Sequence, residues 1–141
     1  MRKAILIVAL LLRPGGSWAH VFPVRSDPRV GATVTVAPTQ VAILFDGEME
    51  PVFSSIEVKN KDNVQVDKKN SHIDTKDPDI LAVTLISALS DGEYYVEWRA
   101  VARDGHLTMG HFSFWIKGGK SPSGDALMPD GHRSFENRWR R

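Results

Sequence analysis

The sequence predicts an all-β fold, an immunoglobulin-like β-sandwich. Past residue 20 the chain consists of short apolar runs separated by turn-forming residues, and no stretch repeats apolar residues with the 3.6-residue period of a helix. The length of 141 residues and the hydrophobic content of 42% suit one globular domain. About seven strands fit into roughly 100 residues, which is typical of such sandwiches.

The first half of the predicted domain supplies four short strands. They follow a turn across residues 26–31, where aspartate, proline and glycine favour a bend. Val41, Ile43 and Phe45 occur at alternate positions and therefore share one face of the second strand. Residues 61–63, with the sequence Lys-Asp-Asn, form a hairpin turn before the fourth strand. The expected strands are Thr33–Val36, Gln40–Phe45, Phe53–Lys59 and Val64–Val66.

The second half begins with a polar stretch, Asp67–Asp79, which we expect to be a long loop or a weak edge strand. Three strands follow it, and the second of these alternates most clearly, with charged residues between its apolar and aromatic positions. That pattern predicts a central strand of the core. The three strands are Ile80–Leu85, Tyr94–Ala102 and His106–Lys117, and the inward residues of the second are Tyr94, Val96, Trp98, Ala100 and Ala102.

The first 19 residues have the three parts of a secretory signal peptide. Basic residues at positions 2–3 precede an apolar run, Ala4–Leu12, and the small residues Ser17 and Ala19 occupy the −3 and −1 positions of a cleavage site. A retained membrane anchor is the alternative, but this apolar run is well short of the roughly 20 residues that span a bilayer. We therefore expect cleavage after Ala19, export to the periplasm, and a soluble mature chain that begins at His20.

The composition excludes several classes of function. The chain contains no cysteine, so disulfides, zinc–thiolate sites and thiol nucleophiles are ruled out. Residues 1–19 hold three of the 18 basic residues and none of the 17 acidic ones, which leaves the mature chain with a net charge of −2 and no sign of nucleic-acid binding. A metal site must therefore use nitrogen, oxygen or thioether ligands.

The domain is expected to cover residues 20–118. From residue 119 to residue 141 glycine, serine, proline and charged residues dominate, which predicts a disordered tail. The alternative for its basic and aromatic end, Arg138–Arg141, is a weak docking segment.

His20 gains a second metal-binding nitrogen from the expected cleavage. An N-terminal histidine offers its α-amine and an imidazole nitrogen, which together close a six-membered chelate ring. An α-amine has an ordinary pKa of about 7.7–8.0, so a strongly binding divalent ion can displace its proton near neutral pH. Cu(II) fits best, because it stands at the top of the divalent stability series and prefers tetragonal sites of nitrogen and oxygen. An exposed, frayed terminus is the alternative for His20 taken alone.

Asp104, Gly105 and His106 follow the predicted central strand and form a turn at one end of the sandwich, where sites are often found. Gly105 supplies the backbone freedom that lets the two flanking side chains point the same way. Together with His20, they provide the three nitrogens and one oxygen of a square-planar Cu(II) site. The alternative is a solvated turn, since Asp-Gly is a common turn pair and the same tripeptide recurs at residues 130–132.

Several separated motifs occur in a characteristic order and spacing. They are His20 at the cleavage site, Ser26-Asp27-Pro28 with Gly31, the stretch Leu44–Pro51, and Asp104-Gly105-His106 followed by Gly110, Phe112 and Phe114. In these features, over roughly residues 20–117, the chain resembles the CopC family of periplasmic copper-binding proteins. The resemblance implies a seven-stranded Greek-key sandwich or barrel and a high-affinity site for one Cu(II) ion per chain, with His20, Asp104 and His106 as its ligands.

The chain departs from this family pattern in two places. Some members resemble a carrier with a methionine-rich loop for Cu(I), whereas only Met49, Met109 and Met128 follow residue 20 here, so we predict no Cu(I) site. Glu48 lies in a stretch where family members often have a Ser-Glu-Pro type of sequence. It either orients a ligand imidazole or is a solvated loop acid.

His111 has the wrong parity to join His106 on a regular strand, which predicts a sheet-surface residue.

These observations favour a copper carrier or buffer that serves copper homeostasis or resistance and is not an enzyme. Its expected partners are the copper ion and an inner-membrane copper transporter or another periplasmic copper protein, and the chain itself is expected to be a monomer. A histidine-brace copper oxidase, similar to polysaccharide monooxygenases, is one alternative, but its chemistry needs an open coordination position that Asp104 would fill. A metal-free interaction module is another, because a sandwich fold by itself specifies no function.

Overall fold

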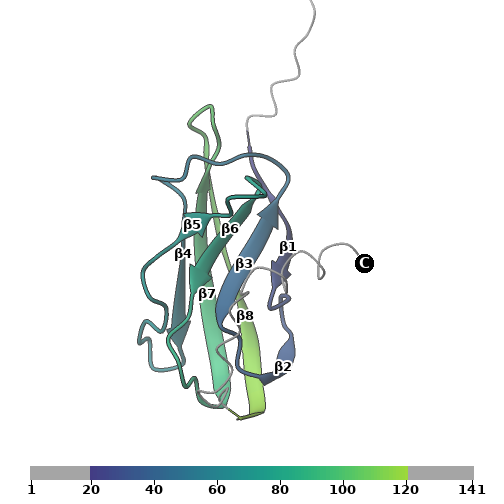
Figure 1. Ribbon diagram of the computed structural model, residues 1–141, viewed down its shortest axis with the longest axis vertical. Coiled ribbons are helices and arrows are strands. Elements are labelled where there is room, and N and C mark those ends of the chain that lie inside the picture. Colours follow the sequence, from purple (N-terminus) through teal and green to yellow (C-terminus); the bar gives the residue numbers. More distant parts are fainter. Residues whose placement is uncertain (1–19, 121–141) are drawn as a thin grey trace, which may run out of the picture.

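The computed structural model describes residues 20–120 (Figure 1). The expected signal peptide, residues 1–19, and nearly all of the expected tail lie outside the described residues. The described part consists of strands joined by turns and loops. Within residues 20–120, no helix is long and apolar enough to cross a membrane.

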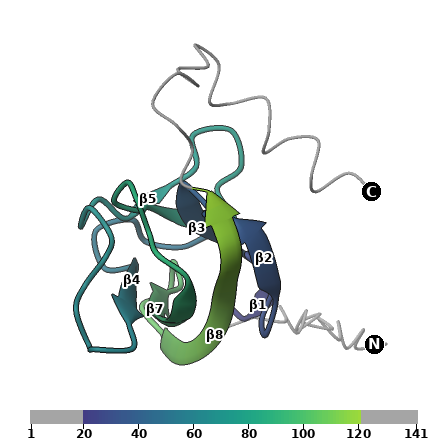
Figure 2. The same cartoon turned by 90° about the horizontal axis from the view of Figure 1, so that it is seen from below.

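Within this range eight strands form two four-stranded sheets, seen end-on in Figure 2. The strands of the first sheet lie in the order β1-β3-β6-β5 and those of the second in the order β2-β8-β7-β4. The predicted all-β, two-layer fold is confirmed. The strands are β1 (Pro23–Asp27), β2 (Thr33–Val36), β3 (Gln40–Phe45), β4 (Ser55–Asn60), β5 (His72–Ile73), β6 (Ile80–Thr84), β7 (Gly92–Val101) and β8 (Leu107–Lys120).

The number of strands differs by one from the expected seven, and the differences lie at sheet edges. β1 includes Ser26 and Asp27, which were expected to be part of the early turn. β5 is a two-residue strand within the expected polar stretch. Val64–Val66 forms no strand, although its middle residue, Gln65, makes an isolated bridge to Lys59. Short edge strands are held mainly by the backbone of a neighbouring strand, so their own side chains show little alternation.

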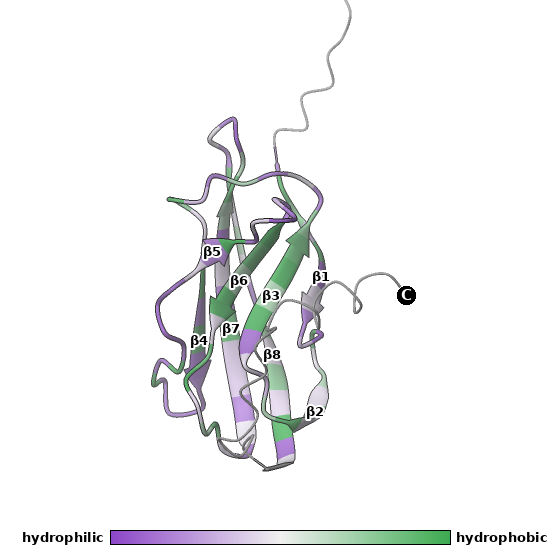
Figure 3. Cartoon of the chain, viewed as in Figure 1, coloured by the Kyte–Doolittle hydropathy of each residue, from purple (hydrophilic) through white to green (hydrophobic). Residues whose placement is uncertain are grey.

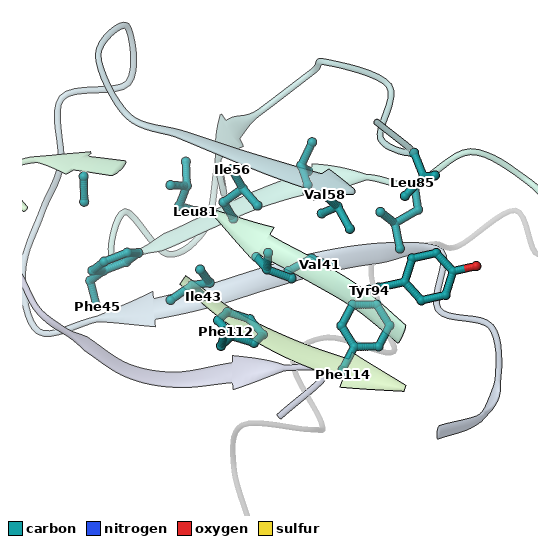
Figure 4. Packing of buried hydrophobic residues seen from close by; sticks show 14 of the residues in the cluster. Val41, Ile43, Phe45, Ile56, Val58, Leu81, Leu85, Tyr94, Phe112 and Phe114 are labelled. Atoms are coloured by element: carbon teal, nitrogen blue, oxygen red, sulfur yellow. The ribbon is translucent and has the colours of Figure 1, made fainter. Parts of the chain in front are cut away.

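The core lies between the two sheets and is made by the alternating faces that the sequence predicts (Figure 4). Val41 and Ile43 of β3 are completely buried, and so are Val96 of β7 and Phe114 of β8. Tyr94 stacks on the ring of Phe114 and donates its hydroxyl hydrogen to a backbone carbonyl, so burial leaves no unpaired polar group there. Figure 3 shows that β3 and β6 are largely hydrophobic, while the connecting loops are mostly hydrophilic.

β7 and β8 form the longest ladder of the molecule. Residues 92–101 pair with residues 107–116 in one continuous antiparallel register. This register sets Trp98 opposite Gly110, and a methyl group added at Gly110 would lie 2.7 Å from the Trp98 ring. The half-buried Trp98 also packs edge-on against Phe45 at 5.4 Å between ring centroids. Trp98 is therefore a half-buried sheet residue, as its alternation predicts.

The chain changes sheets between β1 and β2. β1 pairs antiparallel with β3 in the first sheet, whereas β2 pairs parallel with β8 in the second. Gly31 adopts a φ of 70° in the connection, a conformation that glycine reaches without steric cost. Its N–H donates to the carbonyl of Ser113 at 2.8 Å, and Trp115 N–H donates to Ala32 at the same distance.

Gly110→Ala is expected to lower the free energy of unfolding by about 1–3 kcal/mol, the usual cost of overpacking a core. The added methyl group would force the Trp98 ring or β8 to move. Chemical denaturation followed by circular dichroism measures the change. Ser113→Ala, on the outward face of the same strand, is the matched control and should cost little. Equal stability of Gly110→Ala and the parent protein would show that Trp98 does not pack over Gly110 in solution.

Candidate metal centre

The turn between β7 and β8 has the geometry that its Asp-Gly sequence favours. Ala102 N–H donates to the carbonyl of His106, and Gly105 N–H donates back to the carbonyl of Ala102, both at 2.9 Å. Gly105 has a φ of 90°. Three-residue hairpin loops commonly close in this way, with a β-turn followed by a glycine at positive φ. The predicted bend at Gly105 is thus present, and Asp104 and His106 are the residues that flank it.

Asp104 and His106 bond to each other twice. The backbone N–H of His106 donates to one carboxylate oxygen of Asp104 at 3.1 Å, and His106 Nδ1 lies 3.0 Å from the other. The pKa of Asp104 is held below its usual value, chiefly because the carboxylate accepts that backbone N–H. Both side chains are substantially exposed, with 35% and 52% of their surfaces accessible. The pair is therefore pre-oriented yet open to solvent.

His20 is exposed, but the two residues after it are firmly attached to the sandwich. Val21 is only 4% exposed and its carbonyl accepts a hydrogen bond of 2.7 Å from the hydroxyl of Thr108, 87 positions away in the sequence. Phe22 and Asp46 bond reciprocally, because Phe22 N–H donates to the Asp46 carboxylate and Asp46 N–H donates to the Phe22 carbonyl. The path of the chain at His20 is therefore set by both β8 and the loop after β3.

These attachments bring His20 next to the β7–β8 turn. Its ring lies 5.0 Å from the ring of His106, centroid to centroid, in an edge-to-face arrangement, and 6.0 Å from the ring of Phe22. All three predicted ligand residues thus lie at one end of the molecule. In the described part of the chain, no three histidine, aspartate or glutamate side chains already converge as a metal site. The fourth predicted donor is the α-amine of His20, which is not a side chain.

Acidic side chains gather around this end of the sandwich. Burial raises the pKa of Asp79 above its usual value, and the neighbouring carboxylates of Asp77, Glu48 and Asp46 raise it further. Glu48 pairs with Arg103 at 3.0 Å, and more than half of its side-chain surface is exposed. Glu48 was expected either to orient a ligand imidazole or to be a solvated loop acid. In the structure its carboxylate contacts Arg103 of the turn, and no described bond joins it to a histidine.

The remaining candidate donors lie elsewhere. His111 is exposed on the outer face of the second sheet, as its parity predicts, and faces Glu97 across the ladder. His72 lies on β5 and its ring nitrogen bonds the carbonyl of Asn70. Met49 is 2% exposed and belongs to the core, whereas Met109 is 67% exposed.

Sequence reasoning missed the residues that hold the N-terminal segment. Asp46 and Gly47 begin the acidic stretch after β3, and nothing in the sequence pattern marks Asp46 as the partner of Phe22. A side chain at Gly47 would press on Val21, with a Cβ 3.3 Å from its methyl group, so this glycine permits the close approach. Thr108 occurs in a regular strand and its hydroxyl role has no sequence signal.

A comparison with protein-family models identifies the family of the chain. Residues 23–117 match the model described as the CopC domain. The chain belongs to the CopC family. The match includes Asp104 and His106 and begins three residues after His20.

Two bacterial proteins illustrate the sequence similarity. The chain is 31% identical over 117 residues to "Protein YobA" of Escherichia coli strain K12, and the match covers 83% of this chain and 94% of that protein. It is 35% identical over 120 residues to "Copper transport protein CutJ" of Bacillus subtilis strain 168, and that match covers 85% of this chain but 22% of CutJ.

Two crystal structures share the fold. CopC from Methylosinus trichosporium OB3b superposes with a TM-score of 0.64 at 28% identity and covers 70% of this chain and 94% of its own. PcoC from Escherichia coli, titled a methionine-rich copper resistance protein, superposes with a TM-score of 0.62 at 26% identity and covers 70% of this chain and all of its own. Both likenesses support the two-sheet CopC architecture.

Asp79→Asn is expected to stabilise the protein at pH 7 by about 0.5 kcal/mol, the scale of a partly exposed charge interaction. A pKa that is higher in the folded state means that the ionised carboxylate costs stability as the pH rises. The advantage should therefore disappear near pH 3, where the carboxyl group is protonated in both states. Thermal unfolding at the two pH values measures it, with Asp62→Asn on an exposed turn as the control. A gain that persisted at low pH would contradict an electrostatic cause.

Proposed function

We propose that the chain is exported to the periplasm, cleaved after Ala19, and binds one Cu(II) ion as a copper carrier or buffer in copper homeostasis or resistance. The proposed ligands are the α-amine and imidazole of His20, the carboxylate of Asp104 and the imidazole of His106. The role requires no catalysis, because four protein donors would fill the plane of the ion and leave no in-plane position for a substrate.

The observation that carries this proposal is the contact between the rings of His20 and His106. Two imidazoles 5.0 Å apart can turn about their side-chain bonds to meet one ion, and both are exposed enough to do so. A hydrogen bond from Nδ1 of His106 to Asp104 leaves Nε2 to face a metal. Because Nδ1 and Nε2 point to opposite sides of the ring, Asp104 would have to release its contact with Nδ1 to donate an oxygen to the same ion, and its side chain, 35% exposed, has room to turn.

The names of relatives supply independent support for copper. CutJ is called a copper transport protein and PcoC a copper resistance protein. PcoC is titled methionine-rich, whereas this chain has few methionines and buries Met49 in its core. Nitrogen and oxygen donors at the His20 end favour Cu(II) over the thioether chemistry that suits Cu(I).

The acidic surroundings of the proposed site suit the capture of a cation. Asp46, Glu48 and Asp79 lie close enough together to raise the pKa of Asp79, and their field would concentrate divalent ions at this end of the sandwich. The proposed partner that receives or supplies copper is a membrane copper transporter or another periplasmic copper protein. CutJ supports a transporter as the partner, because it is called a copper transport protein and the stretch similar to this chain is only 22% of its length.

Adding one residue before His20 in the purified mature protein should weaken Cu(II) binding by more than about 100-fold. The extra residue converts the α-amine into an amide, which removes one donor and the chelate ring. Loss of a group that merely orients a ligand already costs about 10- to 100-fold. Titration against a competing chelator measures the affinity, and electron paramagnetic resonance reports whether the ion is in a tetragonal, nitrogen-rich site.

Two single variants test the same assignment within the native terminus. His106→Ala should weaken binding strongly, whereas His72→Ala, an exposed histidine on β5, should leave it unchanged. Equal affinity of the native and extended termini would refute the proposed site. Equal loss in both histidine variants would refute the assignment of His106.

Thr108→Val should reduce the Cu(II) affinity by about 10-fold, at the lower end of the range for groups that position a ligand. Valine keeps the shape of threonine but cannot donate the hydrogen bond to Val21 that holds the N-terminal segment on β8. Thr33→Val, on the exposed β2, is the control and should bind copper normally. An unchanged affinity of Thr108→Val, with the fold intact by circular dichroism, would show that this bond does not position His20.

A further inference from the structure

Two large apolar side chains project into solvent from the turn before β4. Val52 is 85% exposed and Phe53 is 61% exposed. The backbone of this turn is nevertheless fixed on β7, because Glu50 N–H donates to the carbonyl of Val101 at 2.7 Å and Val101 N–H donates to the hydroxyl of Ser54 at 3.0 Å. The described part of the chain leaves both side chains largely uncovered, and adjacent exposed apolar groups of this kind mark an interaction surface.

The same end of the sandwich carries a surplus of negative charge. The loops before β4 and β6 and the turn between β7 and β8 all lie there (Figure 1). Within residues 46–54, 74–79 and 102–106 there are seven carboxylates but only two lysine or arginine residues, which favours a cationic occupant. The carboxylates are Asp46, Glu48, Glu50, Asp74, Asp77, Asp79 and Asp104, and the basic residues are Lys76 and Arg103, the latter paired with Glu48.

The residues Arg138–Arg141 have the complementary chemistry, three arginines around one tryptophan. They lie outside the described residues, but the chain before them is long enough to reach this surface. β8 ends at Lys120, at the opposite end of the sandwich (Figure 1), and its 14 residues span about 45 Å. Trp139 follows 19 positions later, and an extended chain of that length spans up to about 65 Å.

We propose that Arg138–Arg141 docks on residues 46–53 of its own chain, with Trp139 on Val52 and Phe53 and the arginines on the carboxylates that precede them. Arginine pairs with carboxylates through two parallel hydrogen bonds, and tryptophan covers a large apolar area. Because the segment is tethered, its effective concentration at the surface is in the millimolar range, so a weak contact is sufficient. The docking itself does not depend on copper.

Paramagnetic relaxation in the full mature chain tests this contact. The sequence contains no cysteine, so Asn137→Cys takes a single nitroxide label next to the segment. Amide signals of residues 46–53 should lose about half or more of their intensity, because a millimolar contact at a millimolar effective concentration is about half occupied. A label at Ser121→Cys, directly after β8, should leave these signals unchanged. Absence of any loss from the label at position 137 would overturn the proposal.

A mixed sample separates contact within one chain from contact between two copies. Nitrogen-15-labelled chains without a nitroxide are combined with an equal amount of nitroxide-labelled Asn137→Cys chains that carry no nitrogen-15. The observed signals of residues 46–53 should keep their intensity. A loss as large as in the doubly labelled chain would show that the segment of a second copy docks here, and would overturn docking within the chain.

Charge variants test the role of the arginines. Arg140→Gln with Arg141→Gln should reduce the loss of signal severalfold, and so should raising sodium chloride from about 0.05 M to about 0.5 M, which shortens the range of the attraction. Lys61→Gln with Lys68→Gln removes the same charge from exposed positions at the opposite end of the sandwich and should change nothing. An undiminished loss in the arginine variant would overturn their role.

A surface variant tests the apolar half of the contact. Phe53→Ser should weaken the docking, whereas Val64→Ser, at a residue 54% exposed on the hairpin at the opposite end, should leave it unchanged. Both side chains are exposed, so neither variant removes a core contact. Equal docking in Phe53→Ser and the parent chain would overturn the contact between Trp139 and this turn.

Docking should oppose copper binding, because the arginines would lie at the end of the molecule that holds His20 and His106 and would repel a cation. This consequence rests on the proposed function. Arg140→Gln with Arg141→Gln should bind Cu(II) about 2- to 5-fold more tightly than the parent chain at low salt, the scale of a screened charge interaction. Equal affinities in chains whose docking differs would overturn the competition, whereas failure of both chains to bind Cu(II) would contradict the proposed function and not the docking.

Discussion

The uninterrupted ladder between β7 and β8 is the constraint on which the rest of the structure depends. It fixes a single register over ten residue pairs, and a slip of one residue would turn the inward face of β8 toward solvent. The buried rings of Phe112 and Phe114 make such a slip costly, since burying one large apolar side chain contributes about 1.5–3 kcal/mol. The same register closes the turn that carries Asp104 and His106. Core packing and the candidate metal centre are therefore consequences of one strand pairing.

The path of the N-terminal segment decides where His20 lies. Residues after His20 touch β8 at Thr108, leave it to join the first sheet as β1, and return to it at Gly31. The segment is thereby shared between the sheets, and its bond to Thr108 holds His20 next to His106 at the β7–β8 turn.

The sequence predicted what depends on alternation and on local turn chemistry. A two-residue apolar period was strong enough to assign the buried faces of the two long strands and of the strand with Val41, Ile43 and Phe45. The positive φ of Gly105 follows from its place in an Asp-Gly turn. β1 could not be predicted because Ser26 is the one buried residue among its five, so its side chains show no apolar alternation. The bonds from Thr108 to Val21 and from Asp46 to Phe22 join residues distant in sequence, so no local pattern indicates them. The proximity of His20 to His106 was expected from the family resemblance, and the contacts that produce it were not.

Ordering the first residues of a domain is usually unfavourable, and the structure shows how the segment after His20 is held. Fixing the backbone of two residues costs about 2–4 kcal/mol of conformational entropy. Burial of Val21 returns about 1.5–3 kcal/mol, and each hydrogen bond to Thr108 or Asp46 contributes about 0.5–1.5 kcal/mol. The two sides nearly balance, so Val21 and Phe22 can be ordered before any metal arrives. In the proposed mature chain, binding of the ion would then have to order only His20 itself. The described hydrogen bonds of this segment involve Val21 and Phe22, so none of them competes for the α-amine that the proposed cleavage would create at His20.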